Sequence, residues 1–157
     1  MKNEFSSNDD IINVEDIAQR IEELREERDG YDNDIAEAHQ VETDCSDEVA
    51  AQYAASRIGA PEDEMTEERA KLSNIESLMA ELQGAGGDFQ WEGDWYPSHI
   101  IAESHMRDYA QQMAEDCDMI KPDAGWPYTC IDWERATEEF KQDYTIVEFN
   151  GNTFYCR

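Results

Sequence analysis

Repulsion between carboxylates is the strongest constraint on what this chain can fold into. Its 157 residues include 39 Asp and Glu against 12 Lys and Arg, which gives a formal net charge of -27. A net charge of magnitude about 2–8 keeps a small domain soluble, and a much larger charge destabilises the compact state through self-repulsion. We therefore expect either a partner that uses the negative surface or a high-salt environment that screens it.

The acidic and the aromatic residues are distributed differently along the chain. Residues 1–87 hold 24 acidic and 7 basic side chains, a balance of -17, and residues 88–157 hold 15 and 5, a balance of -10. All four Trp and four of the five Phe lie after residue 88. Because the run Gly84-Ala85-Gly86-Gly87 breaks regular structure between the two parts, we predict an acidic helical hairpin over 1–87 and a small α+β domain over 88–157.

Apolar residues in the first part follow the heptad spacing of a packed helix. Seven positions, separated alternately by four and three residues and with one basic member, form this seam: Ile17, Ile21, Leu24, Arg28, Tyr31, Ile35 and Ala38. A second seam follows Pro61: Met65, Leu72, Ile75, Met79 and Leu82. We predict an antiparallel, coiled-coil-like pair of helices, the first over 14–40, with a shorter helix over about 46–58 between them.

The second part carries two β-hairpin signals. Aromatic residues flank Glu92-Gly93-Asp94, which has turn-forming residues at its centre. Asn150-Gly151 lies between two β-rich runs, 144–149 and 152–157, and suits the two positive φ angles of a type I′ turn. We predict a short hairpin or a paired extended segment at the first turn and a C-terminal hairpin at the second.

Two helices are predicted between these hairpins, starting at the capping residues Ser104 and Asp132. The first presents an apolar face made of Met106, Tyr109, Ala110, Met113 and Cys117. The second carries Trp133, Ala136 and Phe140. We expect one shared core of the C-terminal domain, formed by Trp133, Phe140, Phe149 and Phe154.

The last third of the chain carries a family resemblance. Its residues are the run Trp126-Pro127-Tyr128-Thr129-Cys130-Ile131-Asp132-Trp133-Glu134, then Asp143-Tyr144-Thr145, Val147-Glu148-Phe149 and the final Asn-Gly hairpin. From about Ser104 onward the chain resembles the C-terminal segment of ArdA-type antirestriction proteins and of acidic phage or prophage proteins of unknown role. The resemblance implies an acidic dimer that mimics duplex DNA in the binding cleft of type I restriction enzymes. ArdA-type proteins have further α/β modules where this chain has the predicted helical hairpin, so the resemblance supports phage or mobile-element origin more than a particular target.

The sequence holds no motif of an enzyme or of a metal site. The sequence contains none of four common catalytic or nucleotide-binding motifs: G-x-S-x-G, the P-loop, G-x-G-x-x-G and H-E-x-x-H. Three histidines and four cysteines lack the paired spacing of a zinc site: His39, His99, His105, Cys45, Cys117, Cys130 and Cys156. We expect no catalytic residue, no cofactor, no metal ion and reduced thiols.

The distribution of apolar residues predicts the cellular location and the oligomeric state. No apolar run approaches the roughly 18 residues of a membrane span, and no charged-then-apolar signal segment begins the chain. We expect a soluble protein of the host cytoplasm that does not contact membranes. The seam from Ile17 to Ala38 exposes more apolar surface than one partner helix covers, which predicts a homodimer.

The negative surface disfavours direct binding of nucleic acid, because phosphates would be repelled. The predicted function is instead that of an acidic phage or mobile-element inhibitor. Its carboxylates would mimic phosphates and block a DNA- or RNA-binding groove of a host defence complex of the restriction or CRISPR type. Ten carboxylates are the predicted partner-binding residues: Glu22, Glu23, Glu26, Glu27, Asp29, Asp32, Asp34, Glu115, Asp116 and Asp118. A non-enzymatic coiled-coil interaction module and an acidic protein of a halophile are the alternatives.

Overall fold

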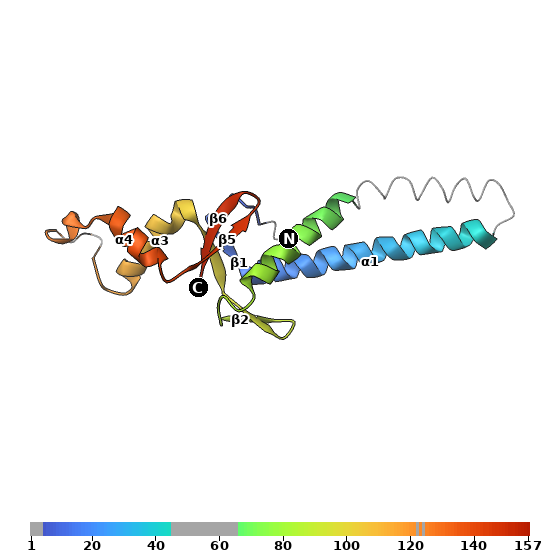
Figure 1. Ribbon diagram of the computed structural model, residues 1–157, viewed down its shortest axis with the longest axis horizontal. Helices are drawn as coiled ribbons and strands as arrows, with labels where there is room; N and C mark the ends of the chain where they lie inside the picture. The colour runs from blue at the N-terminus through green and yellow to red at the C-terminus, as the bar shows by residue number, and fades with distance from the viewer. Residues whose placement is uncertain (1–4, 45–65, 122, 124) are drawn as a thin grey trace. The chain divides into compact units, whose positions relative to one another are not determined.

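The computed structural model describes residues 5–44, 66–121, 123 and 125–157. These residues combine a long N-terminal helix with a C-terminal antiparallel sheet (Figure 1), as the predicted α+β class requires. Contacts divide the chain into a helical unit, Ala18–Ser77, and a sheet unit, Met1–Ile17 with Leu78–Arg157. None of the described helices is long and apolar enough to cross a membrane.

Two helices make up the described part of the helical unit, and both continue into the sheet unit. Helix α1 covers Val14–Asp44, and the second helix covers residues 66–82. Ile17, Ile21 and Leu24 of the first predicted seam are at most 2% exposed, whereas Tyr31 and Ile35 are half-buried. Four residues of the second predicted seam are also buried: Leu72, Ile75, Met79 and Leu82.

Burial of the seam removes part of the apolar surface on which the dimer prediction is based. The sequence predicts a homodimer because seam surface stays uncovered, but one chain already buries the seam from Ile17 to Leu24. This stretch therefore supplies no apolar surface for a second copy, and the oligomeric state stays a prediction. The helix predicted over 46–58 and the seam residue Met65 lie outside the described residues, so the complete helical hairpin and its coiled-coil geometry stay predictions as well.

Four antiparallel strands form the main sheet in the order β1-β4-β6-β5. Their bounds are Ile11–Asn13 for β1, His99–Ala102 for β4, Thr145–Phe149 for β5 and Asn152–Cys156 for β6. Strand β1 pairs with β4, with Ile12 opposite Ile100. Residues 11–13 thus join the C-terminal sheet, which differs from the predicted division into 1–87 and 88–157.

Both predicted β-hairpins are confirmed. In the C-terminal hairpin Phe149 lies opposite Asn152, and the φ angles of Asn150 and Gly151 are 50° and 79°. A separate two-stranded sheet pairs β2 (Phe89–Trp91) with β3 (Asp94–Tyr96). Its turn residues Glu92 and Gly93 have φ angles of 50° and 93°. Two successive positive φ angles are the requirement of a type I′ turn, which explains why these short sequences could be recognised.

The helices of the sheet unit start differently from one another. Asp132 caps α4 (Trp133–Lys141) as predicted, because its Oδ1 accepts the Arg135 N–H at 3.2 Å. The predicted cap at Ser104 is wrong. Ser104 lies inside a 3-10 turn, η1 (Glu103–His105), and α3 (Met106–Asp116) begins after His105, which makes no side-chain cap hydrogen bond. A second 3-10 turn, η2, covers Tyr128–Cys130.

The two faces of the main sheet contribute to different cores. Ile101 and Tyr155 point to one face and form a buried cluster with Met106. Three aromatic residues pack against this cluster: Tyr109, Phe140 and Tyr144. Because side chains alternate along a strand, the neighbours Ile100 and Phe154 point to the opposite face.

The predicted single aromatic core is wrong for this reason. Phe154 of β6 lies opposite Val147 of β5, and Phe149 comes two residues after Val147 on β5. Both phenylalanines therefore lie on the face opposite Tyr155. The ring of Phe5 covers that face at Phe149, with 6.2 Å between ring centroids. Phe140 instead packs with the Tyr155 cluster.

Gly86 lies against the backbone of two other segments of the sheet unit. A Cβ atom at this position would lie 2.5 Å from the Cα of Pro97 and 2.9 Å from the carbonyl oxygen of Arg157. Both are backbone atoms, so relief would require a backbone shift. The neighbouring Gly87 has no atom within 4 Å of the equivalent Cβ position, which makes it a matched control.

We predict that Gly86→Ala lowers the free energy of unfolding by about 1–3 kcal/mol, the cost of overpacking. Gly87→Ala should change it by less than about 0.5 kcal/mol. Urea unfolding followed by tryptophan fluorescence measures both values. Equal stability of the two variants would contradict the close approach at Gly86.

Candidate functional site

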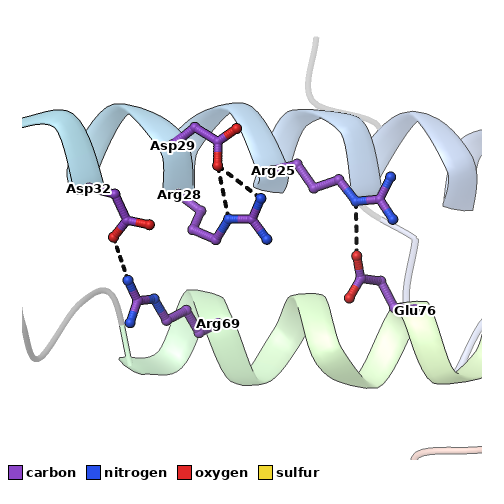
Figure 2. Close-up of polar contacts among 6 residues, drawn as sticks. All are labelled: Arg25, Arg28, Asp29, Asp32, Arg69 and Glu76. Atoms are coloured by element: carbon purple, nitrogen blue, oxygen red, sulfur yellow. Dashed lines mark hydrogen bonds and ion pairs between the residues drawn. The ribbon is translucent and has the colours of Figure 1, made fainter.

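Cations of the helical unit are paired with carboxylates. In its described part, all five Arg and Lys side chains contact a carboxylate: Arg20, Arg25, Arg28, Arg69 and Lys71. Figure 2 shows the guanidinium groups of Arg25, Arg28 and Arg69 between α1 and the second helix. The described cations therefore pair with carboxylates of this unit itself.

Two of these pairs connect the helices. Arg25 Nε donates to Glu76 Oε1 at 2.9 Å, and Arg69 Nη2 donates to Asp32 Oδ1 (Figure 2). Position 25 pairs with 76 and position 32 pairs with 69, so the two helices run in opposite directions where these contacts join them. The order of the pairs agrees with the antiparallel arrangement that the sequence predicts.

Among the described cations of this unit, Arg20 is the least exposed, with 14% of its side chain exposed. Its guanidinium nitrogens lie 2.9 Å from Glu23, 4.0 Å from Glu27 and 3.9 Å from Glu68. One cation thus faces three carboxylates from two helices. Removing it would leave those three charges close together in a partly buried place, where they are screened less than on the surface.

A stripe of carboxylates follows the outside of α1. At 3.6 residues per turn, four exposed residues fall within roughly 80° of arc and extend over about 22 Å of helix: Glu22, Glu26, Asp29 and Glu37. Asn33, also exposed, lies on the same face. We call these four carboxylates the outer stripe. Asp29 also accepts hydrogen bonds from Arg28, at 2.8 Å and 3.0 Å (Figure 2).

The structure therefore divides the carboxylates predicted on α1. Glu22, Glu26 and Asp29 belong to the outer stripe, whereas Glu23 and Glu27 contact Arg20 and Asp32 contacts Arg69. Asp34 is exposed on a different face of the helix. Glu37 was missed, although its spacing of fifteen residues from Glu22 would have placed it on the stripe.

The second predicted group lies at the C-terminal end of α3 and belongs to the sheet unit. Glu115 and Asp116 are in the last turn of this helix, which carries no basic residue, and Asp118 follows with a φ angle of 55°. We call these three residues the α3-end cluster. Carboxylates next to the negative end of a helix dipole typically cost about 0.3–1 kcal/mol each. A placement that opposes local stability is typical of residues retained for another role.

The described thiols and histidines form no site for a metal ion. Within the described ranges, no three His, Cys, Asp or Glu side chains converge to hold one. Burial raises the pKa of Cys156 to about 11, and its Sγ donates to the Thr145 carbonyl at 3.6 Å. Cys156 thus stays a protonated thiol, while Cys117 and Cys130 are free and exposed.

No family model, curated protein or solved structure matches this chain. The resemblance to ArdA-type antirestriction proteins therefore stays a prediction. The functional interpretation therefore depends on the residues of this chain, which present carboxylates in two separate groups, the outer stripe and the α3-end cluster.

We predict that Arg20→Gln lowers the free energy of unfolding by about 1–3 kcal/mol, because it leaves partly buried carboxylates uncompensated. The loss should shrink as salt rises and screens the remaining repulsion. Arg135→Gln is the control, because its contact with Glu139 is a surface pair with side chains 78% and 66% exposed, worth at most about 1 kcal/mol. If urea unfolding gave Arg20→Gln the same small loss, the charge-neutralising role of Arg20 would be ruled out.

Proposed function

We propose that this chain is an acidic inhibitor from a phage or mobile element that acts in the host cytoplasm. Its carboxylates mimic nucleic-acid phosphates and occupy the DNA- or RNA-binding groove of a host defence complex of the restriction or CRISPR type. The observation that carries this proposal is the sorting of charge in the helical unit. The described cations are paired with carboxylates of the unit, while the outer stripe is exposed to solvent.

Counterion release explains how such a surface competes with a nucleic acid. A groove lined by Lys and Arg gains free energy when its cations replace the counterions condensed on phosphates. Carboxylates held on a helix offer the same cations a preformed negative partner, and they contain no phosphodiester bond to cleave. Since the attraction is spread over many exposed groups, no single carboxylate should dominate the affinity.

The spacing of charge limits how much of a duplex one stripe can replace. The outer stripe presents four carboxylates over about 22 Å, whereas each strand of B-DNA carries about one phosphate per 3.4 Å of axis. One stripe is therefore sparser than one DNA strand. The α3-end cluster adds three carboxylates, and a homodimer, which is also part of this proposal, would double both groups.

Exposed apolar side chains support a second candidate, a protein-interaction module in which the charge only maintains solubility. Trp126 is 84% exposed, Met119 is 69% exposed and Tyr128 is 44% exposed. Aromatic residues commonly dominate the affinity of protein interfaces. This candidate predicts binding that tolerates salt and loss of carboxylates but fails when Trp126 is replaced by Ala.

A matched pair of charge variants separates the two candidates. The stripe variant carries Glu22→Gln, Glu26→Gln, Asp29→Asn and Glu37→Gln. The control variant removes four exposed charges from the sheet unit through Glu92→Gln, Glu134→Gln, Asp143→Asn and Glu148→Gln. Both variants have the same net charge, so a difference between them reports the position of the charge and not its amount.

The measurement starts with affinity capture from a bacterial host lysate, followed by competition between the captured protein's nucleic acid and this chain. At about 0.2–1 kcal/mol for each of four exposed pairs, the stripe variant should bind roughly 4-fold to 900-fold more weakly. It should also show a shallower dependence of affinity on salt. The control variant should stay within about threefold of the parent. Equal binding by both variants would exclude the outer stripe, and a partner that never competes with nucleic acid would exclude mimicry.

A further inference from the structure

The sheet unit contains a pocket that is unlike the acidic surface. Its volume is about 360 Å³, within the lower part of the range of about 300–1,000 Å³ typical of small-molecule sites. Polar groups from separate parts of the chain line it: Asp88, Ser98, His99, Tyr109, Tyr144 and Arg157. Asp88 is the only carboxylate side chain in this lining, in a chain with a net charge of -27.

Hydrogen bonds connect three of these residues in a chain. His99 Nδ1 lies 2.8 Å from Ser98 Oγ, and His99 Nε2 lies 3.1 Å from the Tyr109 hydroxyl. Tyr144 and Arg157 belong to the same pocket lining. Ser98, His99 and Tyr109 are thus held in fixed positions relative to one another.

Aromatic packing fixes the same groups from behind. The His99 and Tyr109 rings have centroids 5.8 Å apart, and Phe140 packs against Tyr109 at 6.2 Å and against Tyr144 at 5.0 Å. Phe140 in turn packs on the buried cluster of the sheet. Rings packed in this way limit rotation of the hydroxyl-bearing side chains, so the pocket is preorganised.

Arg157 and Tyr144 supply hydrogen-bond donors to the pocket lining. A guanidinium has donors and no acceptor. Burial raises the pKa of Tyr144, and Tyr109 raises it further against the opposing effect of Arg157. Tyr144 therefore stays a neutral hydroxyl, whose O–H can donate to a ligand.

We infer that this pocket binds a small oxyanion, a phosphate group or a carboxylate, through Arg157 and Tyr144, with the ring of His99 on the same lining. A guanidinium beside a hydroxyl donor matches the several acceptor oxygens of such a group. The volume exceeds that of a bare ion, so the remaining space accommodates the organic part of a small anionic metabolite. Asp88 lies on the lining and favours a ligand whose other end is neutral or cationic. This site is independent of the proposed mimicry, since it recognises an anion, whereas the outer stripe presents anions.

Histidine side-chain NMR tests this inference on the full chain. Inorganic phosphate and acetate are titrated separately at about 0.15 M salt, where long-range repulsion from the protein is screened beyond about 8 Å. We expect saturable shifts of the His99 ring resonances at millimolar anion, the affinity that a few hydrogen bonds supply. The ring of His105, which lies 3.9 Å from Asp10 and outside the pocket lining, is the internal control and should not move.

Two variants assign the binding to the pocket. Arg157→Gln should weaken the anion at least about tenfold, because it removes the charge-assisted donor. Tyr144→Phe keeps the ring that packs on Phe140 and should weaken the anion severalfold, while Arg135→Gln, a charge-matched change outside the pocket, should leave the affinity unchanged. Saturation by phosphate alone or by acetate alone identifies the class of oxyanion. Absence of a saturable His99 shift with both anions, or equal affinity in Arg157→Gln and Arg135→Gln, would overturn the inference, whatever the outcome for the acidic surface.

Discussion

Pairing of arginines with carboxylates between α1 and the second helix is the interaction on which the helical unit depends. Surface ion pairs are individually weak, about 0.2–1 kcal/mol, so their importance here is the way they distribute charge. Arg20 and Arg25 neutralise carboxylates close to the buried apolar residues. The carboxylates on the outside of α1 can then stay exposed although the chain carries a net charge of -27.

The sheet unit is stabilised differently, by apolar cores on two faces of a four-stranded sheet. Ile101, Met106 and Tyr155 bury one face under aromatic residues of α3 and α4, and Phe154 belongs to the other. The aromatic packing that closes the first face also positions Tyr109 and Tyr144 at the polar pocket. One set of packing contacts thus supports both stability and a preorganised group of donors.

Local signals in the sequence predicted local structure, and long-range contacts escaped prediction. Asn150-Gly151 and Asp132 were recognisable because a type I′ turn and a helix cap each require particular residue types. Strand β1 was missed because three residues are too short to show an alternating pattern. Phe140 and Phe154 were assigned to one core because sequence does not reveal which face of a sheet a helix covers. Arg20 contacts Glu68, and the pocket combines residues from position 88 to 157. Such pairings become apparent only once the chain is folded.

We expect repulsion among the exposed carboxylates to outweigh the attraction within the ion pairs that oppose it. Thermal unfolding of the full chain in increasing sodium chloride tests this expectation without any partner. Raising salt from about 0.01 M to about 1 M shortens the screening distance from about 30 Å to about 3 Å, which relieves repulsion between exposed charges more than it weakens partly buried pairs. We predict that the unfolding midpoint rises steeply over the lower part of this range. A midpoint that falls as salt is added would show the opposite, that attraction within the ion pairs is the larger electrostatic contribution.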